Sequence, residues 1–148
     1  MRIPNAPSGL IKEAGYCGRS GIIWTANWWV ALETISIVLK EKNGNRCLPI
    51  VIGFFEAQAI YLRLNRIVPP RPFSHDLMVQ IVHRLDSHLD KILIDELNAD
   101  TFFAKLYLLR STGEEYIIDS RPSDAIALAL REGAPMFVND DVFLKLEN

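Results

Sequence analysis

The sequence predicts an α+β fold in which antiparallel β-hairpins and a meander pack with three main helices around one core. The 148 residues are 49% hydrophobic and 23% charged, which is the balance of a single globular domain. Runs rich in β-branched residues recur along the chain with turn residues between them, which is typical of antiparallel strands. Segments rich in alanine, leucine and glutamine or glutamate lie between these runs and predict helices.

The first element that the sequence predicts is a strand over residues 30–40. Apolar residues alternate in it, so one face is expected to be buried. Asn43 and Gly44 then supply the two positive-φ positions of a type I′ turn. Residues 47–52 form the returning strand of the hairpin. Pro49 cannot donate a hydrogen bond to a ladder, so it predicts an edge or a bulge in that strand.

Three helices are predicted. The first covers residues 55–65 and ends before the proline-rich residues 69–72. The second begins with Ser74 as its N-cap. The third covers residues 124–131, is apolar nearly all round and ends at Gly133, so it is expected inside the protein. The second helix carries an apolar stripe that is expected to face the core, formed by Leu77, Met78, Ile81, Val82, Leu85 and Leu89.

The C-terminal half is expected to form an antiparallel meander. Residues 91–97 and 101–110 are two β-rich runs, and a third covers residues 115–119. A last short strand is expected over residues 136–138, and one or two helical turns follow from Asn139.

The chain divides into an N-terminal extension, residues 1–29, and a domain over residues 30–148. The extension shows no hydrophobic periodicity, but it contains three tryptophans close together: Trp24, Trp28 and Trp29. Such a cluster favours packing against the domain or a subunit neighbour, and the alternative is a platform on which bases stack. We therefore expect a homo-oligomer.

The charge balance does not favour a generic nucleic-acid binder. The formal net charge is -2, so contact with nucleic acid would depend on a local patch. The sequence has one cluster of basic residues, formed by Arg63, Arg66 and Arg71. These arginines are candidate phosphate ligands, and the alternative is that they are simply exposed to solvent. The spacing of Cys17 and Cys47 is typical neither of a disulfide framework nor of a zinc site. No apolar run is long enough for a membrane span, and a cytoplasmic protein is expected.

Four blocks of sequence resemble the bifunctional nuclease domain in order and spacing. They are LPIVIGFFEAQAI (48–60), PPRPFSHDLM (69–78), TFFAKLYL (101–108) and IDSRPSDAIALALREGAPMFV (118–138). The resemblance covers about residues 38–140 and leaves the tryptophan-rich leader unmatched. It implies an α+β fold that tends to oligomerise, with activity on DNA and RNA.

Phosphodiester cleavage requires an activated nucleophile and stabilisation of charge on the phosphoryl oxygens. On the matching positions, the candidate catalytic residues are Asp119, Asp124, His75 and Arg121. A divalent cation, magnesium or manganese, prefers oxygen ligands, and its candidates are Asp119, Asp124, Asp76 and Glu56. No organic cofactor is indicated.

Each of these residues also has an architectural interpretation. Arg121 can bridge Asp119 or Asp124, while Ser123 or Asp124 caps the third helix. Asp76 can complement a helix dipole, and His75 can simply pack. The sequence thus leaves two functional hypotheses open: a metal-assisted nuclease of low sequence specificity, and a non-catalytic oligomeric binding or assembly module.

Overall fold

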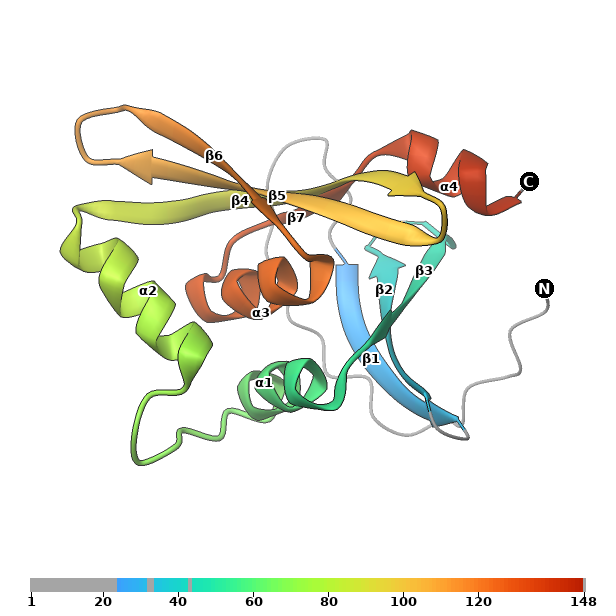
Figure 1. The fold of residues 1–148 in the computed structure, drawn as a ribbon, viewed down its shortest axis with the longest axis horizontal. Helices are drawn as coiled ribbons and strands as arrows, with labels where there is room; N and C mark the ends of the chain where they lie inside the picture. The colour runs from blue at the N-terminus through green and yellow to red at the C-terminus, as the bar shows by residue number, and fades with distance from the viewer. Residues whose placement is uncertain (1–23, 32–33, 43, 148) are drawn as a thin grey trace.

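The computed structural model describes residues 24–31, 34–42 and 44–147, and the side chains within these ranges from residue 35 onward. This part of the chain has the predicted α+β fold, with two β-sheets and four helices (Figure 1). The helices are α1 (Phe54–Leu64), α2 (Ser74–Arg84), α3 (Pro122–Glu132) and α4 (Asp140–Glu147). The strands are β1 (Trp24–Ala31), β2 (Thr34–Glu41), β3 (Cys47–Ile52), β4 (Ser87–Asn98), β5 (Thr101–Arg110), β6 (Glu115–Ser120) and β7 (Met136–Val138).

The first sheet has the order β1-β2-β3 and is antiparallel throughout. The strand expected over residues 30–40 is confirmed as β2, with Ile37 and Leu39 buried on one face, but its expected start is wrong, because β1 ends at Ala31 and β2 begins at Thr34. The tryptophans of the leader lie on β1, but their side chains fall outside the described residues. Pro49 lies in β3 at the edge of the sheet, as predicted, where its missing N–H costs no ladder bond.

The type I′ turn predicted for the first hairpin is also wrong. Gly44 does not have the positive φ that this turn needs. Beyond the Lys40–Cys47 pair, the backbone N–H of Glu41 donates to the carbonyl oxygen of Arg46 at 3.0 Å, so the loop is longer than two residues. A two-residue turn with positive φ at both positions occurs instead between β4 and β5, where Ala99 has φ 46° and Asp100 has φ 63°.

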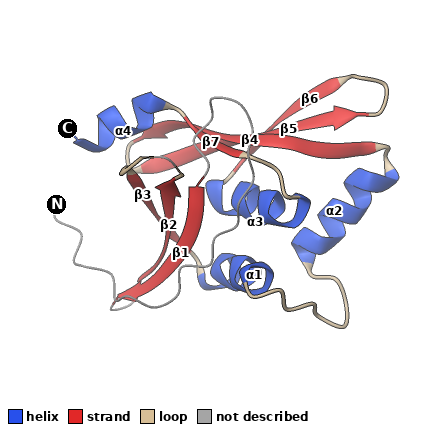
Figure 2. Ribbon diagram, turned by 180° about the vertical axis from the view of Figure 1, so that it is seen from behind, coloured by secondary structure: helices blue, strands red, loops and turns tan. Residues whose placement is uncertain are grey.

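The second sheet has the order β6-β5-β4-β7. Strands β4, β5 and β6 form the predicted antiparallel meander, and β7 adds a parallel strand beside β4. The α3 helix packs against β4 and β5, and α1 covers the other side of α3, so α3 lies between the sheet and α1 (Figures 1 and 2). Six residues of α3 are buried, as its apolar sequence predicts: Pro122, Ser123, Ala125, Ile126, Ala127 and Ala129.

The apolar stripe of α2 does not face the core, which overturns that expectation. The helix ends at Arg84, and Asp86 with φ 53° turns the chain into β4, so Leu89 belongs to a strand rather than to the helix. Ser74 is the first helical residue and not the N-cap; the N-cap is Phe73. Four of the stripe residues are between 42% and 63% exposed: Leu77, Met78, Ile81 and Leu85.

Candidate functional site

The candidate site lies where the first turn of α3 meets α1 and α2. Pro122 is the first residue of α3, because its fixed φ suits a helix start and the missing N–H is not needed there. Arg121 precedes it as the N-cap in extended conformation, and no side chain caps the helix. The predicted capping by Ser123 or Asp124 is therefore wrong, and both side chains are available for other contacts.

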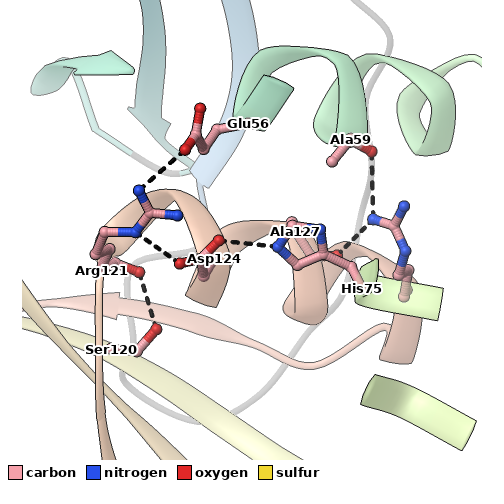
Figure 3. Close-up of polar contacts among 8 residues, drawn as sticks. Glu56, Ala59, His75, Ser120, Arg121, Asp124 and Ala127 are labelled. Atoms are coloured by element: carbon pink, nitrogen blue, oxygen red, sulfur yellow. Dashed lines mark hydrogen bonds and ion pairs between the residues drawn. The ribbon is translucent and has the colours of Figure 1, made fainter. Parts of the chain in front are cut away.

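Four side chains from three helices and one loop form a continuous polar chain (Figure 3). His75 Nε2 lies 2.9 Å from Asp124 Oδ1. The other carboxylate oxygen, Asp124 Oδ2, accepts a 2.8 Å hydrogen bond from Arg121 Nε. Arg121 Nη1 donates to Glu56 Oε1 at 2.9 Å. Thus α1, α2 and α3 each contribute one residue, and Arg121 joins two carboxylates.

Exposure increases along this chain from histidine to arginine. The His75 side chain is 11% exposed, that of Asp124 24% and that of Arg121 64%. Nδ1 of His75 has no protein partner among the described residues, and it is not one of their buried unpaired atoms. This nitrogen therefore reaches solvent, whereas Nε2 is held by Asp124.

The charges reinforce one another. Burial alone would raise the pKa of Asp124, but hydrogen bonds from Arg121 and His75 outweigh it and lower the pKa below its ordinary value. The Asp124 carboxylate in turn raises the pKa of Arg121, with a further contribution from Glu56. Asp124 is consequently an ionised carboxylate at neutral pH.

A second polar contact lies two turns further along α3. Arg131 Nε donates to Asp76 Oδ1 at 2.6 Å, and Arg131 Nη1 donates to the carbonyl oxygens of Ala59 and Ala127. The neighbouring residues His75 and Asp76 on α2 thus bind Asp124 and Arg131 on α3. Burial alone would raise the pKa of Asp76, but hydrogen bonds from Arg131 and the backbone N–H of Phe73 lower it. These contacts fix the packing of all three helices.

Sequence reasoning missed Arg131, although a signal was present: it is the one basic residue in a helix predicted to be apolar nearly all round. A charged residue buried in such a helix requires a partner from another element. The side chain is 7% exposed, and Asp76 is that partner.

The structure does not bring Asp119 to the other candidates. In β6, Asp119 pairs with Lys105 of β5, whereas its neighbour Ile118 pairs with the core residue Leu106. Because successive side chains of a strand point to opposite faces, Asp119 lies on the face of the sheet away from α3. It is exposed, and no described contact links it to Asp124.

The three candidate phosphate ligands are exposed, but they do not share one set of contacts. Arg63 donates through Nε and Nη2 to the carbonyl oxygens of Leu130 and Arg131 at the end of α3. Arg66 follows α1 with φ 56°, and Arg71 lies in the proline-rich connector. Arg63 lines a pocket that is described below, and neither Arg66 nor Arg71 lines that pocket.

Among the described residues, no group of three or more His, Cys, Asp or Glu side chains is placed to hold a metal ion. The proposed ligands Asp124 and Glu56 are both occupied by Arg121, and Asp76 is occupied by Arg131. In the same part of the chain, no helix is long and apolar enough to cross a membrane.

Comparisons with known proteins identify the family. A model described as the bifunctional nuclease domain matches residues 37–147. An uncharacterized protein of Mycobacterium tuberculosis is 41% identical over 106 residues, which are 72% of this chain and 62% of the relative. Bifunctional nuclease 1 of Oryza sativa subsp. japonica is 32% identical over 107 residues, 70% of this chain and 32% of the relative.

Bifunctional nuclease 1 of Arabidopsis thaliana is 26% identical over 107 residues, which are 70% of this chain and 33% of the relative. The chain thus spans about a third of the length of these plant relatives and 62% of the mycobacterial one. The domain match covers most of the chain and includes α1 to α4, so this chain belongs to the bifunctional nuclease domain family.

Proposed function

We propose that this domain cleaves phosphodiester bonds of DNA or RNA at the cluster formed by Glu56, His75, Arg121 and Asp124. The observation that carries the proposal is the His75–Asp124 contact, in which a carboxylate holds one ring nitrogen while the other reaches solvent. The names of the plant relatives, which are bifunctional nucleases, support the same reaction class.

Each residue has a definite chemical role in this proposal. When Nε2–H of His75 donates its hydrogen bond to Asp124, Nδ1 carries a lone pair and can take a proton from the attacking water or hydroxyl group. The same ring can later return that proton to the leaving oxygen. Arg121 is the most exposed member and carries a positive charge that stabilises the phosphoryl oxygens. Glu56 and Asp124 orient its guanidinium group.

The metal-assisted form of the proposal meets a physical obstacle in this arrangement. A magnesium or manganese ion needs oxygen donors that are free to approach it. The guanidinium of Arg121 already lies between Glu56 and Asp124, so the cation would have to displace a like charge. We therefore assign no step to a cation, and the cation requirement expected from the sequence is the alternative that the test below decides.

The test is cleavage of single-stranded DNA and RNA by the purified domain, with magnesium, with manganese and with a chelator. We expect cleavage of at least one substrate that persists in chelator, because proton transfer by His75 and charge stabilisation by Arg121 need no cation. Activity lost in chelator and restored by magnesium or manganese would support the metal-assisted form instead. Intact substrate under every condition would refute the nuclease proposal.

A second candidate function is an assembly module that forms a homo-oligomer. Exposed apolar residues on α2 favour an assembly role. Leu77 and Ile81 of α2, and Leu85 directly after it, are spaced four residues apart and are exposed to solvent. On β6, Tyr116 and Ile118 are each 43% exposed although they lie on the core side of the sheet. Each of these groups offers exposed apolar side chains that a second copy of the chain can cover.

Replacement of Ile81 tests this surface. We expect the unmodified chain to sediment as a dimer or larger at micromolar concentration, and Ile81→Glu to shift it toward the monomer, because a buried carboxylate without a partner opposes association. Gln58→Glu, at an exposed position of α1, is the matched control and should leave the assembly unchanged. A wild-type monomer would contradict the proposal.

A further inference from the structure

We propose that the pocket between the end of α1, the proline-rich connector and α2 binds a small phosphorylated molecule with a flat ring, of the nucleoside monophosphate class. The pocket has a volume of about 390 Å³, within the range of small-molecule sites. It is separate from the cluster around Arg121, and none of the four residues of that cluster lines it.

Two guanidinium groups face this pocket with unused donors. Arg131 lines it, and although its side chain is 7% exposed, Nη2 has no protein partner among the described residues and is not a buried unpaired atom there. Nη2 is therefore the donor of Arg131 that remains for a ligand in this pocket. Arg63 also lines the pocket and uses only Nε and Nη2, so Nη1 is available.

The internal contacts of both arginines hold these donors in place before a ligand arrives. Arg131 is fixed by Asp76 and by two carbonyl oxygens, and Arg63 is fixed by carbonyl oxygens at the end of α3. Such preorganisation reduces the entropy that binding costs. The pocket contains two arginines and one carboxylate, Asp76, which leaves one uncompensated positive charge for an anion.

The remaining wall is apolar and rigid. Proline side chains are flat and already ordered, so they offer a surface for a ring at little entropic cost. This wall is formed by Ile67, Val68, Pro69, Pro70, Pro72 and Val79.

A phosphate group matches the two arginines better than a carboxylate does. Its three terminal oxygens can accept bonds from two guanidinium groups that approach from different helices. Gln80 adds an amide that can donate to or accept from a ring substituent. The site therefore selects a phosphate joined to a body that contains a flat ring with a polar edge.

Calorimetric titration of the full chain with adenosine monophosphate tests this assignment, with adenosine, inorganic phosphate and benzoate as comparison ligands. We expect the monophosphate to bind at least about tenfold more tightly than each comparison ligand. Adenosine lacks the anion, inorganic phosphate lacks the ring, and benzoate offers two carboxylate oxygens where the phosphate offers three terminal ones. Equal binding of inorganic phosphate and the monophosphate would overturn the ligand class.

Matched variants locate the site. Arg63→Gln should weaken binding of the monophosphate by about tenfold or more, since one guanidinium donor is lost. Arg66→Gln removes the same charge three residues away, outside the pocket, and should change binding by less than about twofold. Val79→Phe should also weaken binding, because it fills the pocket without changing charge. Equal effects of the two arginine variants would overturn the site.

Asp124→Asn separates this site from the proposed reaction centre. The variant should bind the monophosphate with wild-type affinity, because Asp124 does not line the pocket. A loss of affinity as large as that of Arg63→Gln would place the ligand in the catalytic cluster and refute the proposal. If the chain binds the monophosphate but cleaves no nucleic acid, the pocket proposal is supported and the nuclease proposal is refuted.

Discussion

Arg131→Ala is expected to lower the free energy of unfolding by about 3–5 kcal/mol, which is typical when one partner of a buried ion pair is removed. The side chain of Arg131 is 7% exposed, and its guanidinium group binds α1, α2 and α3 at the same time, through Ala59, Asp76 and Ala127. Its removal leaves a partly buried carboxylate and two carbonyl oxygens without their donor. Urea denaturation followed by circular dichroism measures the difference.

The control for this prediction is Arg66→Ala, which removes an exposed arginine after the end of α1. It should change the free energy of unfolding by less than about 0.5 kcal/mol, as surface substitutions usually do. If both variants unfold at the same urea concentration, the Arg131 contacts do not hold the helices together. Arg131→Met keeps much of the side-chain volume but removes the polar contacts. The part of the unfolding free energy that both variants lose therefore measures those polar contacts.

Acid should weaken the wild type through the same contacts. The pKa of Asp76 is lowered in the folded protein, so its pairing stabilises the fold above the ordinary aspartate pKa of about 3.9. That stability is lost as the pH falls through the lower, folded-state value. Because Arg131→Ala removes the strongest hydrogen-bond donor to Asp76, the acid-dependent loss from this residue should be smaller in the variant than in the wild type.

Much of the fold follows from local sequence patterns. The β-branched run before Asn98 and the run after it form a hairpin, and Gly133 ends α3 with φ 67° as predicted. Bounds that depend on a single unusual backbone conformation were harder to predict. Asp86 adopts a positive φ that ends α2 early, and nothing in the apolar spacing around it signals that stop.

The α2 stripe shows why helical periodicity does not identify the buried face by itself. Leu77, Met78 and Ile81 form an apolar face, but α2 packs on α3 through a different side that includes the buried His75. The contacts with Asp124 and Arg131 determine how the helix is rotated. An apolar face that remains exposed after this packing is free for a partner.

The sequence predicts most of the residues that form the candidate site, but it does not predict their geometry. Glu56, His75, Arg121 and Asp124 were all candidates on sequence grounds, and the structure joins them. Asp119 was grouped with them because it is only five residues from Asp124. The face on which it lies depends on strand register, which pairs Ile118 with the buried Leu106 and so directs Asp119 away from α3.

This difference between the two aspartates leads to the sharpest functional prediction. Asp124→Asn should reduce the rate of phosphodiester cleavage by about 10²–10⁴-fold, the range expected when general acid–base catalysis is impaired. The amide keeps the shape of the side chain but loses the charge that holds His75 and Arg121, and it can orient the imidazole in the wrong tautomer. Initial rates on one single-stranded substrate, under the condition of highest activity, give the ratio.

Asp119→Asn is the matched control, because it makes the same chemical change five residues away on the other face of the sheet. It should cleave at nearly the wild-type rate, and both variants should retain the wild-type circular dichroism spectrum. A purely architectural cluster predicts a different pattern, in which Asp124→Asn lowers the melting temperature without a selective loss of rate. Loss of activity in Asp119→Asn with full activity in Asp124→Asn would move the reaction centre to the opposite face of the sheet. A trace contaminating nuclease would cleave equally in all three preparations, so only the ratio between the two variants assigns the activity to this domain.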